Sequence, residues 1–241
     1  MKNPIYLILI MVLQTFFPIF SQYDEHSSEI NSTVPELFEF HDIIYPIWHT
    51  AYPEKNYSML KEMVPDVNAG AEKIYSAKLP GILRDKESDW KEGVSKFRSS
   101  VERYDKAMEG TDETEMLNAA EELHSDFEML VRIIRPVTKE VDEFHKVLYM
   151  IYHHYWPNKN MEELGKAVDD LNMRADELNN CVLPKWAADK SEDFIEKSQK
   201  LYDSTENLKA LKDAEADVSE IEKAIEKVHD NYVALEKLFD E

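Results

Sequence analysis

A short block of this chain occurs twice, and this repeat constrains the fold more than any other feature. Residues 39–56 (EFHDIIYPIWHTAYPEKN) return 104 positions later, without a gap, as residues 143–160 (EFHKVLYMIYHHYWPNKN). Between 38–80 and 142–184, 16 of 43 aligned positions are identical. A one-residue insertion after Met108 moves the offset to 105 for the rest of the chain. We therefore predict a tandem duplication of a unit of roughly 100 residues.

Composition and periodicity favour helices in both units. Only 5 glycines occur in 241 residues, charged residues make up 32% of the chain, and long stretches follow the helical period rather than strand alternation. Asn or Asp residues are placed to cap the second, third and fourth helix of each unit: Asn56, Asp85 and Asp112, then Asn160, Asp189 and Asp217. Pro65 falls inside the second helix and predicts a kink. We predict an all-α protein of about eight helices, arranged as two four-helix bundles.

The chain divides into four segments on this reading. Residues 1–21 resemble an export signal, with Lys2 followed by an apolar stretch from Ile5 to Phe20. This stretch is 16 residues long, shorter than the roughly 20 residues that a spanning helix needs, so we predict no stable membrane insertion after cleavage near Gln22. A flexible polar arm is predicted at 22–35, the first bundle at 36–136 and the second at 137–241. The expected location is periplasmic or secreted.

Charge and cysteine content exclude several functional classes. The net charge of −21 repels nucleic acid and favours cationic partners, including metal ions. Cys181 is the sole cysteine, which excludes an internal disulfide and any thiolate-rich zinc or iron–sulfur site. Since imidazole and carboxylate ligands remain, a metal site here would suit Zn²⁺, Cu²⁺, Fe or Ni²⁺.

The repeated block carries a histidine pattern. His41, Tyr45 and His49 are spaced by four residues, so they share one side of the first helix. The same pattern returns at positions 145, 149 and 153. Eight helical residues span about 12 Å, so one ion bound by either histidine needs ligands from another helix. The fourth helix of each unit offers a Glu-x-x-His pair, at positions 121 and 124 and at 226 and 229.

The first and fourth helices of an up-down-up-down bundle are antiparallel neighbours, so the two patterns are expected to meet. We predict one metal site per bundle, with these ligands: His41, His49, Glu121 and His124 in the first, and His145, His153, Glu226 and His229 in the second. Four further side chains are candidates for hydrogen bonds to the ligands: Tyr45, Tyr149, Asn68 and Asn172.

These patterns favour an exported, non-enzymatic protein that binds a transition metal for buffering, delivery or sensing. One alternative is a periplasmic structural or protein-interaction module, in which the histidines are structural and the partner is an envelope protein. Another is a haem or di-iron redox protein, although the covalent haem motif is absent. We assign no catalytic residue, since neither a Gly-rich phosphate loop nor a Gly-x-Ser-x-Gly motif is present.

Overall fold

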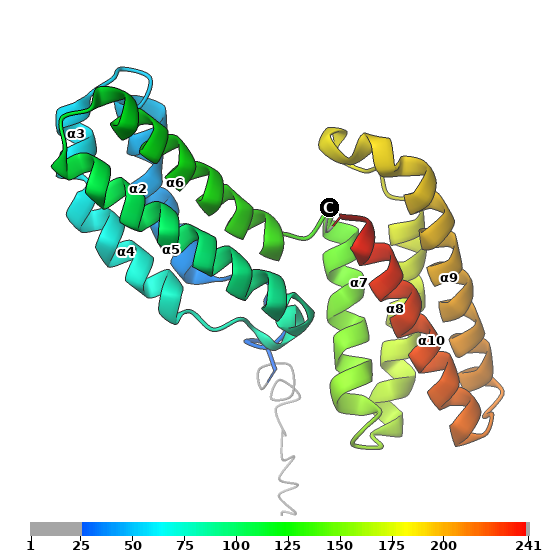
Figure 1. The fold of residues 1–241 in the computed structure, drawn as a ribbon. Helices are drawn as coiled ribbons and strands as arrows, with labels where there is room; N and C mark the ends of the chain where they lie inside the picture. Colours follow the sequence, from blue (N-terminus) through cyan, green and yellow to red (C-terminus); the bar gives the residue numbers. More distant parts are fainter. Residues whose placement is uncertain (1–25, 240–241) are drawn as a thin grey trace, which may run out of the picture.

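The computed structural model describes residues 26–239, which form helices joined by short turns, with no strand among them. The all-α prediction is therefore confirmed. Figure 1 shows two helical bundles joined by a short link between α6 and α7. The first contains α2 (Pro35–Pro46), η1 (Ile47–Ala51), α3 (Tyr57–Glu62), α4 (Val64–Ser76), η2 (Gly81–Lys86), α5 (Glu87–Glu109) and α6 (Glu113–Ile134). The second contains α7 (Lys139–Met150), η3 (Ile151–Tyr155), α8 (Met161–Asn179), η4 (Lys185–Lys190), α9 (Ser191–Asp213), α10 (Val218–Glu236) and η5 (Lys237–Phe239).

Each bundle has its own hydrophobic core. In the first, the Phe40 ring lies 5.1 Å from that of Phe97 and 5.2 Å from that of Phe127, which joins α2 to α5 and α6. In the second, Phe144 on α7 stacks on Tyr232 of α10 at 5.7 Å. The first and fourth long helices of each bundle are thus neighbours. The predicted signal peptide at 1–21 lies outside the described residues.

Most of the predicted helix caps are confirmed. The Asn56 side chain accepts a hydrogen bond from the Met59 amide at 3.1 Å, and Asn160 accepts one from the Glu163 amide at 3.3 Å. The remaining confirmed caps are Asp112, which accepts from the amides of Thr114 and Glu115, and Asp217, which forms a capping box with Glu220. These bonds satisfy amides that the first turn of a helix leaves without partners.

The predicted caps of the third helices are wrong. Asp85 and Asp189 lie inside the 3₁₀ turns η2 and η4, and the long helices α5 and α9 begin only after those turns. The kink at Pro65 is confirmed, because α3 ends at Glu62 and α4 begins at Val64, whereas the corresponding helix α8 is continuous.

The first helix of each bundle ends in a π-helical turn. The Tyr52 amide donates to the Ile47 carbonyl at 2.8 Å, and the Trp156 amide donates to the Ile151 carbonyl at 3.0 Å. Each turn closes on a residue five positions earlier, so the side chains within it no longer follow the 3.6-residue period of an α-helix. The predicted ligands His49 and His153 lie inside these turns.

Residues 26–34 are packed, although the sequence predicts a flexible arm at 22–35. The Val34 side chain is fully buried at the start of α2, and Ile30 packs on the first core. The Glu29 carbonyl accepts from the Ile82 amide at 2.8 Å, and the Ser32 hydroxyl donates to Asp142 at 2.9 Å. This segment therefore links the first bundle to α7. Residues 22–25 lie outside the described residues.

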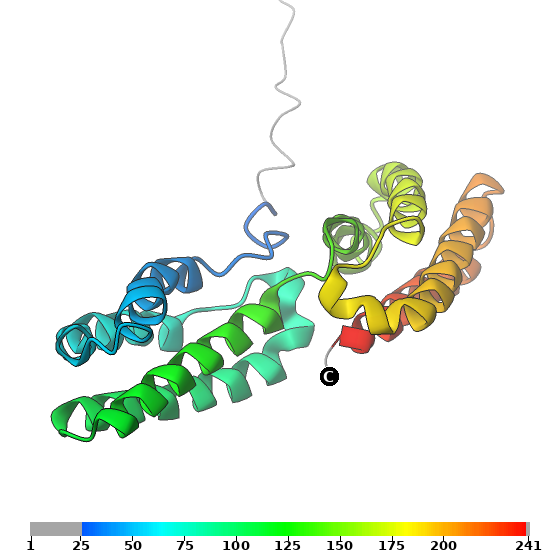
Figure 2. The same ribbon diagram turned by 90° about the horizontal axis from the view of Figure 1, so that it is seen from above.

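The two bundles meet along α7 and η2, the lower region between them in Figure 1 and the centre of the view from above in Figure 2. Tyr149 on α7 is only 2% exposed and packs with the core of the first bundle. Gly81 at the start of η2 lies so close that a Cβ at this position would overlap the Tyr149 hydroxyl. We call this contact region the junction: residues 26–34, η2 and the facing side of α7 and η3.

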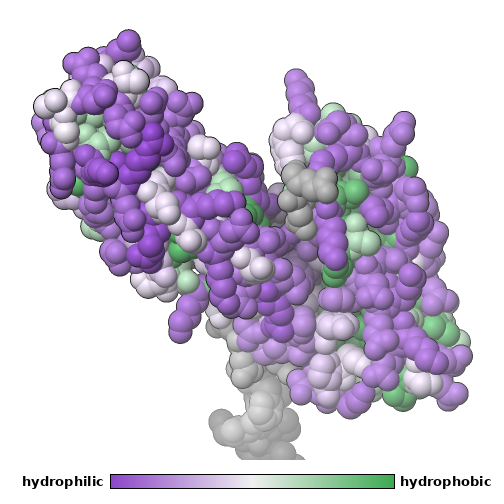
Figure 3. All heavy atoms as spheres, viewed as in Figure 1, coloured by the Kyte–Doolittle hydropathy of each residue, from purple (hydrophilic) through white to green (hydrophobic). Residues whose placement is uncertain are grey.

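One face of the molecule is drawn in Figure 3 with its hydropathy. The face in Figure 3 is mostly hydrophilic with small hydrophobic patches. No helix among residues 26–239 combines the length and the apolar character needed to cross a membrane.

Candidate functional site

The fourth-helix histidines meet the first helix in both bundles, through stacked rings. The His124 ring lies flat on Trp48, with centroids 4.0 Å apart and planes 8° apart. The His229 ring lies on Tyr152 in the same way, at 4.1 Å and 13°. These contacts place the imidazoles where the sequence predicts them, but as packing partners of aromatic rings.

The carboxylates of the Glu-x-x-His pairs do not join these rings. Glu121 is exposed and accepts a hydrogen bond from the Tyr52 hydroxyl at 3.3 Å. Glu226 is exposed as well. The carboxylate nearest to His124 belongs instead to Glu128 one turn further on, with Nε2 and Oε1 3.9 Å apart.

The first-helix histidines have different surroundings in the two bundles. His41 and His49 are exposed, with rings 5.9 Å and 4.4 Å from that of Tyr45. In the second bundle, the Nδ1 atom of His153 lies 3.1 Å from a guanidinium nitrogen of Arg84. Burial and this positive charge lower the pKa of His153 to about 4. A fixed cation at this distance disfavours a metal ion on the same imidazole.

His145 is the most strongly perturbed histidine. Its ring packs on Tyr232 with centroids 4.5 Å apart. Burial, together with nearby His229, Lys86 and His153, lowers the pKa of His145 to about 3. The imidazole is therefore neutral at physiological pH.

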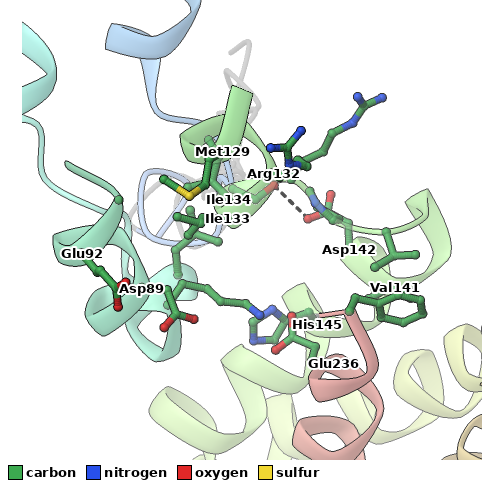
Figure 4. Close-up of a pocket in the computed structure, with 18 of the residues that line it drawn as sticks. Asp89, Glu92, Met129, Arg132, Ile133, Ile134, Val141, Asp142, His145 and Glu236 are labelled. Carbon is green, nitrogen blue, oxygen red and sulfur yellow. Dashed lines mark hydrogen bonds between the residues drawn. The ribbon is translucent and has the colours of Figure 1, made fainter. Parts of the chain in front are cut away.

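His145 also lines a cavity of about 390 Å³ between the bundles. Figure 4 shows its ring beside Glu236 of α10, opposite Ile133 of α6 and Asp89 of α5. The lining carries both positive and negative side chains, so it does not by itself indicate a ligand of one charge.

The two predicted asparagines serve the bundle scaffold. The Asn68 amide donates to both carboxylate oxygens of Asp105 at 2.9 Å, which links α4 to α5. Asn172 donates to Glu206 and links α8 to α9. Neither contact involves a predicted ligand.

One group in the described part of the chain brings enough ligand atoms together to hold a metal ion, and it is not a predicted one. Among residues 26–239, a single set of three or more His, Cys, Asp or Glu side chains has ligand atoms that all lie within 4.8 Å of one another. This set is His26, Glu29 and His154. The eight predicted ligands form no such set.

The three side chains converge from two parts of the chain. His26 and Glu29 belong to one turn, in which the Glu29 amide donates to the His26 carbonyl at 2.9 Å. His154 projects from the π-helical turn η3. Its Nε2 atom lies 3.0 Å from Glu29 Oε2, and His26 Nδ1 lies 3.5 Å from Glu29 Oε1. The two imidazole centroids are 3.9 Å apart.

A second layer of polar groups orients the Glu29 carboxylate. The Tyr149 hydroxyl donates to Glu29 Oε2 at 3.1 Å, and Arg84 donates to the Tyr149 oxygen. Desolvation raises the pKa of Glu29, but hydrogen bonds from Tyr149 and His26 and the charge of His154 outweigh it, so the pKa lies below its ordinary value. The carboxylate therefore remains ionised at neutral pH.

Sequence reasoning missed this group because it favoured residues that recur and gave His26 and His154 no role beyond a surface metal contact. His26 and His154 have no histidine at the matching position of the other unit. The available signal was local: a His-x-x-Glu spacing at 26–29 and the adjacent histidines at 153 and 154.

Comparison of the chain with protein families, with characterised proteins and with solved structures gives no match. The functional assignment therefore depends on the chemistry of the residues themselves.

Proposed function

We propose that this protein is an exported, non-enzymatic metal-binding protein that holds one divalent transition-metal ion between His26, Glu29 and His154. The observation that carries the proposal is the convergence of two imidazoles and an ionised carboxylate from two distant parts of the chain. The same chemistry was expected from the sequence at other positions.

The spacing of the ligand atoms suits a small first-row ion. Ligand atoms bound about 2.0–2.2 Å from a tetrahedral ion stand about 3.3–3.6 Å apart. The separations of 3.5 Å and 3.0 Å between the imidazole nitrogens and the carboxylate oxygens are close to this range. A set of two histidines and one carboxylate suits Zn²⁺, Fe²⁺, Ni²⁺ or Cu²⁺ and leaves a fourth position for water.

The surroundings support ion binding in two further ways. The Tyr149 hydroxyl donates a hydrogen bond that orients the Glu29 carboxylate, and carboxylate ligands of metal ions are commonly oriented in this way. The site is also accessible, with side-chain exposures of 30% for His26, 39% for Glu29 and 17% for His154. Accessible ligands fit reversible exchange, as buffering or delivery of an ion requires.

Export and tandem duplication are parts of the same proposal. The signal at 1–21 and the net charge of −21 fit a periplasmic or secreted protein that attracts cations. Two features support a duplication beyond the sequence repeat. The π-helical turns begin at Ile47 and Ile151, and Lys55 and Lys159 adopt left-handed φ angles of 52° and 55° just before the second helix.

The test is metal binding by the purified chain after removal of metals with a chelator. Calorimetric titration with Zn²⁺, Ni²⁺, Cu²⁺ and anaerobic Fe²⁺ is expected to give one ion per chain for at least one metal. His154→Ala, His26→Ala and Glu29→Gln should each weaken binding more than 10-fold. Tyr149→Phe should weaken binding about 10-fold, because it removes only the outer hydrogen bond.

The chain provides matched controls for these variants. His153→Ala removes the neighbouring imidazole, and His124→Ala and His229→Ala remove the stacked ones, so all three should leave the affinity unchanged. A stoichiometry near zero for every metal would refute the proposal. The proposal would also be refuted if His124→Ala and His229→Ala lost binding while His154→Ala bound normally. That result would place the ion at the histidines predicted from the sequence.

The second candidate is a structural or protein-interaction module. It is favoured by one observation, the matching Trp48–His124 and Tyr152–His229 stacks, which give the recurring histidines a packing role. Under this alternative, metals would leave the thermal unfolding midpoint unchanged. Under the metal proposal, an ion at 100 times its dissociation constant adds about 2.7 kcal/mol to the free energy of unfolding.

A further inference from the structure

The same helix face is bare in one bundle and covered in the other. Phe38, His41 and Tyr45 on α2 and His49 in the turn η1 are exposed along one side of the first helix, and we call this set the α2 strip. Phe38 is 64% exposed and Tyr45 is 53% exposed. At the position that matches Tyr45, Tyr149 on α7 is 2% exposed. The two bundles thus present related surfaces, of which only the second is occupied.

The junction shows what covers this face on α7. One covering element is the turn that contains Glu29, whose carboxylate accepts from the Tyr149 hydroxyl. The other is η2, the 3₁₀ turn that follows the second helix of the preceding bundle. Arg84 of η2 donates to Tyr149 and contacts His153, and Gly81 allows the backbone of η2 to approach the Tyr149 hydroxyl. A first-helix face is therefore a receptor for the 3₁₀ turn of the neighbouring unit.

The second bundle carries the corresponding turn, η4, with exposed apolar side chains. Trp186 within η4 is 67% exposed, and Val182 just before it is 88% exposed. The corresponding residue to Trp186 in η2, Ile82, is 1% exposed. The chain therefore has two exposed surfaces of matching kind: the α2 strip on the first bundle and the 3₁₀ turn η4 on the second.

We propose that the α2 strip of one copy of this chain receives the η4 end of a second copy, in a head-to-tail contact that repeats the arrangement of the junction. The occupant is a second copy because only η4 among the described elements matches η2 in position along its unit. A contact between two different faces does not close on itself in a dimer, so copies add at both ends.

Two substitutions change the details of this contact. Lys185 occupies the place of Gly81, and Ala188 occupies the place of Arg84. By analogy with Gly81 and Tyr149, the Cβ of Lys185 would meet the hydroxyl end of a tyrosine side chain. In the contact between copies this tyrosine is Tyr45, which is exposed, so its ring can rotate away. Without the arginine, the contact between copies is weaker than the junction and depends on concentration.

Charge favours the same pairing. No described residue forms an ion pair with Lys185 at the η4 end or with Asp42 beside the α2 strip, and both side chains are exposed. In a chain of net charge −21, a basic turn facing an acidic helix reduces the repulsion between copies.

The test is sedimentation velocity of the full chain over a range of concentrations, with a chelator present so that metal-bridged association is excluded. The wild type is expected to show a weight-average sedimentation coefficient that rises with concentration. The double variant Phe38→Ser/Tyr45→Ser removes the aromatic side chains of the α2 strip, and Trp186→Ser removes the exposed ring of η4. Each variant alone should therefore remain monomeric. Unchanged circular dichroism is expected, because these residues are exposed.

A mixture of the two variants gives the decisive result. The intact η4 of the Phe38→Ser/Tyr45→Ser variant can bind the intact α2 strip of the Trp186→Ser variant, and no other pairing is available. The mixture should therefore form dimers and nothing larger. Lys185→Gly/Ala188→Arg restores the residues of the junction and should strengthen association at least 10-fold. The proposal is wrong if the wild type remains monomeric throughout, if another partner rather than a second copy occupies the strip, or if the mixture of variants fails to form dimers.

Discussion

Replacement of Gly81 by alanine tests the packing of the junction directly. A Cβ at position 81 would overlap the Tyr149 hydroxyl and lie 3.1 Å from Cζ of the same ring. Tyr149 is 2% exposed and held by Glu29 and Arg84, so it has little room to yield. Overpacking of this kind costs about 1–3 kcal/mol. We therefore expect Gly81→Ala to lower the thermal unfolding midpoint by about 2–4 °C for each kcal/mol lost.

Gly165 provides the matched control. It lies inside α8, and a Cβ there meets no atom within 4 Å. Gly165→Ala should therefore raise stability by about 0.5–1 kcal/mol, since alanine is the better helix former. The two Gly→Ala changes thus have opposite expected signs, and denaturant unfolding followed by circular dichroism measures both.

A double variant locates the effect at the tyrosine hydroxyl. In Gly81→Ala/Tyr149→Phe the overlapping oxygen is absent, so part of the loss should be recovered, with a coupling of at least about 0.5 kcal/mol between the two sites. If Gly81→Ala is as stable as the wild type, or if the double variant shows no coupling, the junction is not packed as described.

Two further predictions concern single side chains. His145 has a folded pKa of about 3 against an ordinary value near 6.5, so the unfolded chain binds the proton more readily and stability should fall as pH drops from about 6.5 towards 3. His145→Gln should flatten this dependence, measured as the urea midpoint at pH 7 and pH 5. Asp112→Ala removes the acceptor of two amides at the start of α6 and should cost about 1 kcal/mol at pH 7 in the same assay.

The helices of this chain follow from short-range chemistry, which explains how much of the fold was predictable. Asp112 and Asp217 bond to amides within three residues, so the sequence alone identifies them as caps. Asp85 and Asp189 have the same residue type, but the 3₁₀ turns around them shift the helix starts to Glu87 and Ser191. Such turns have weak sequence signals, so boundaries near them could not be predicted.

The eight predicted ligands do not converge in the described part of the chain, for a geometric reason. The predicted ligand directions assume an ideal helix, but His49 and His153 lie in π-helical turns that change the angular position of their side chains. The histidines of the fourth helices do reach the first helices, where their rings stack on the side chains of Trp48 and Tyr152. Periodicity predicted which helices meet, but not which chemical groups face each other.

The cluster of His26, Glu29 and His154 illustrates a limit of reasoning from repeats. Several positions that recur in both units serve the core or a cap of each bundle, as Phe40 and Phe144 or Asn56 and Asn160 do. The junction is different, because it joins residues 26–34 and η2 of the first unit to the first helix of the second unit and so requires different residues on its two sides. Gly81, Arg84 and His154 have no identical counterparts, and they lie at or beside the junction. In a chain whose sequence repeats, the residues that depart from the repeat are therefore the first place to look for function that arises between the units.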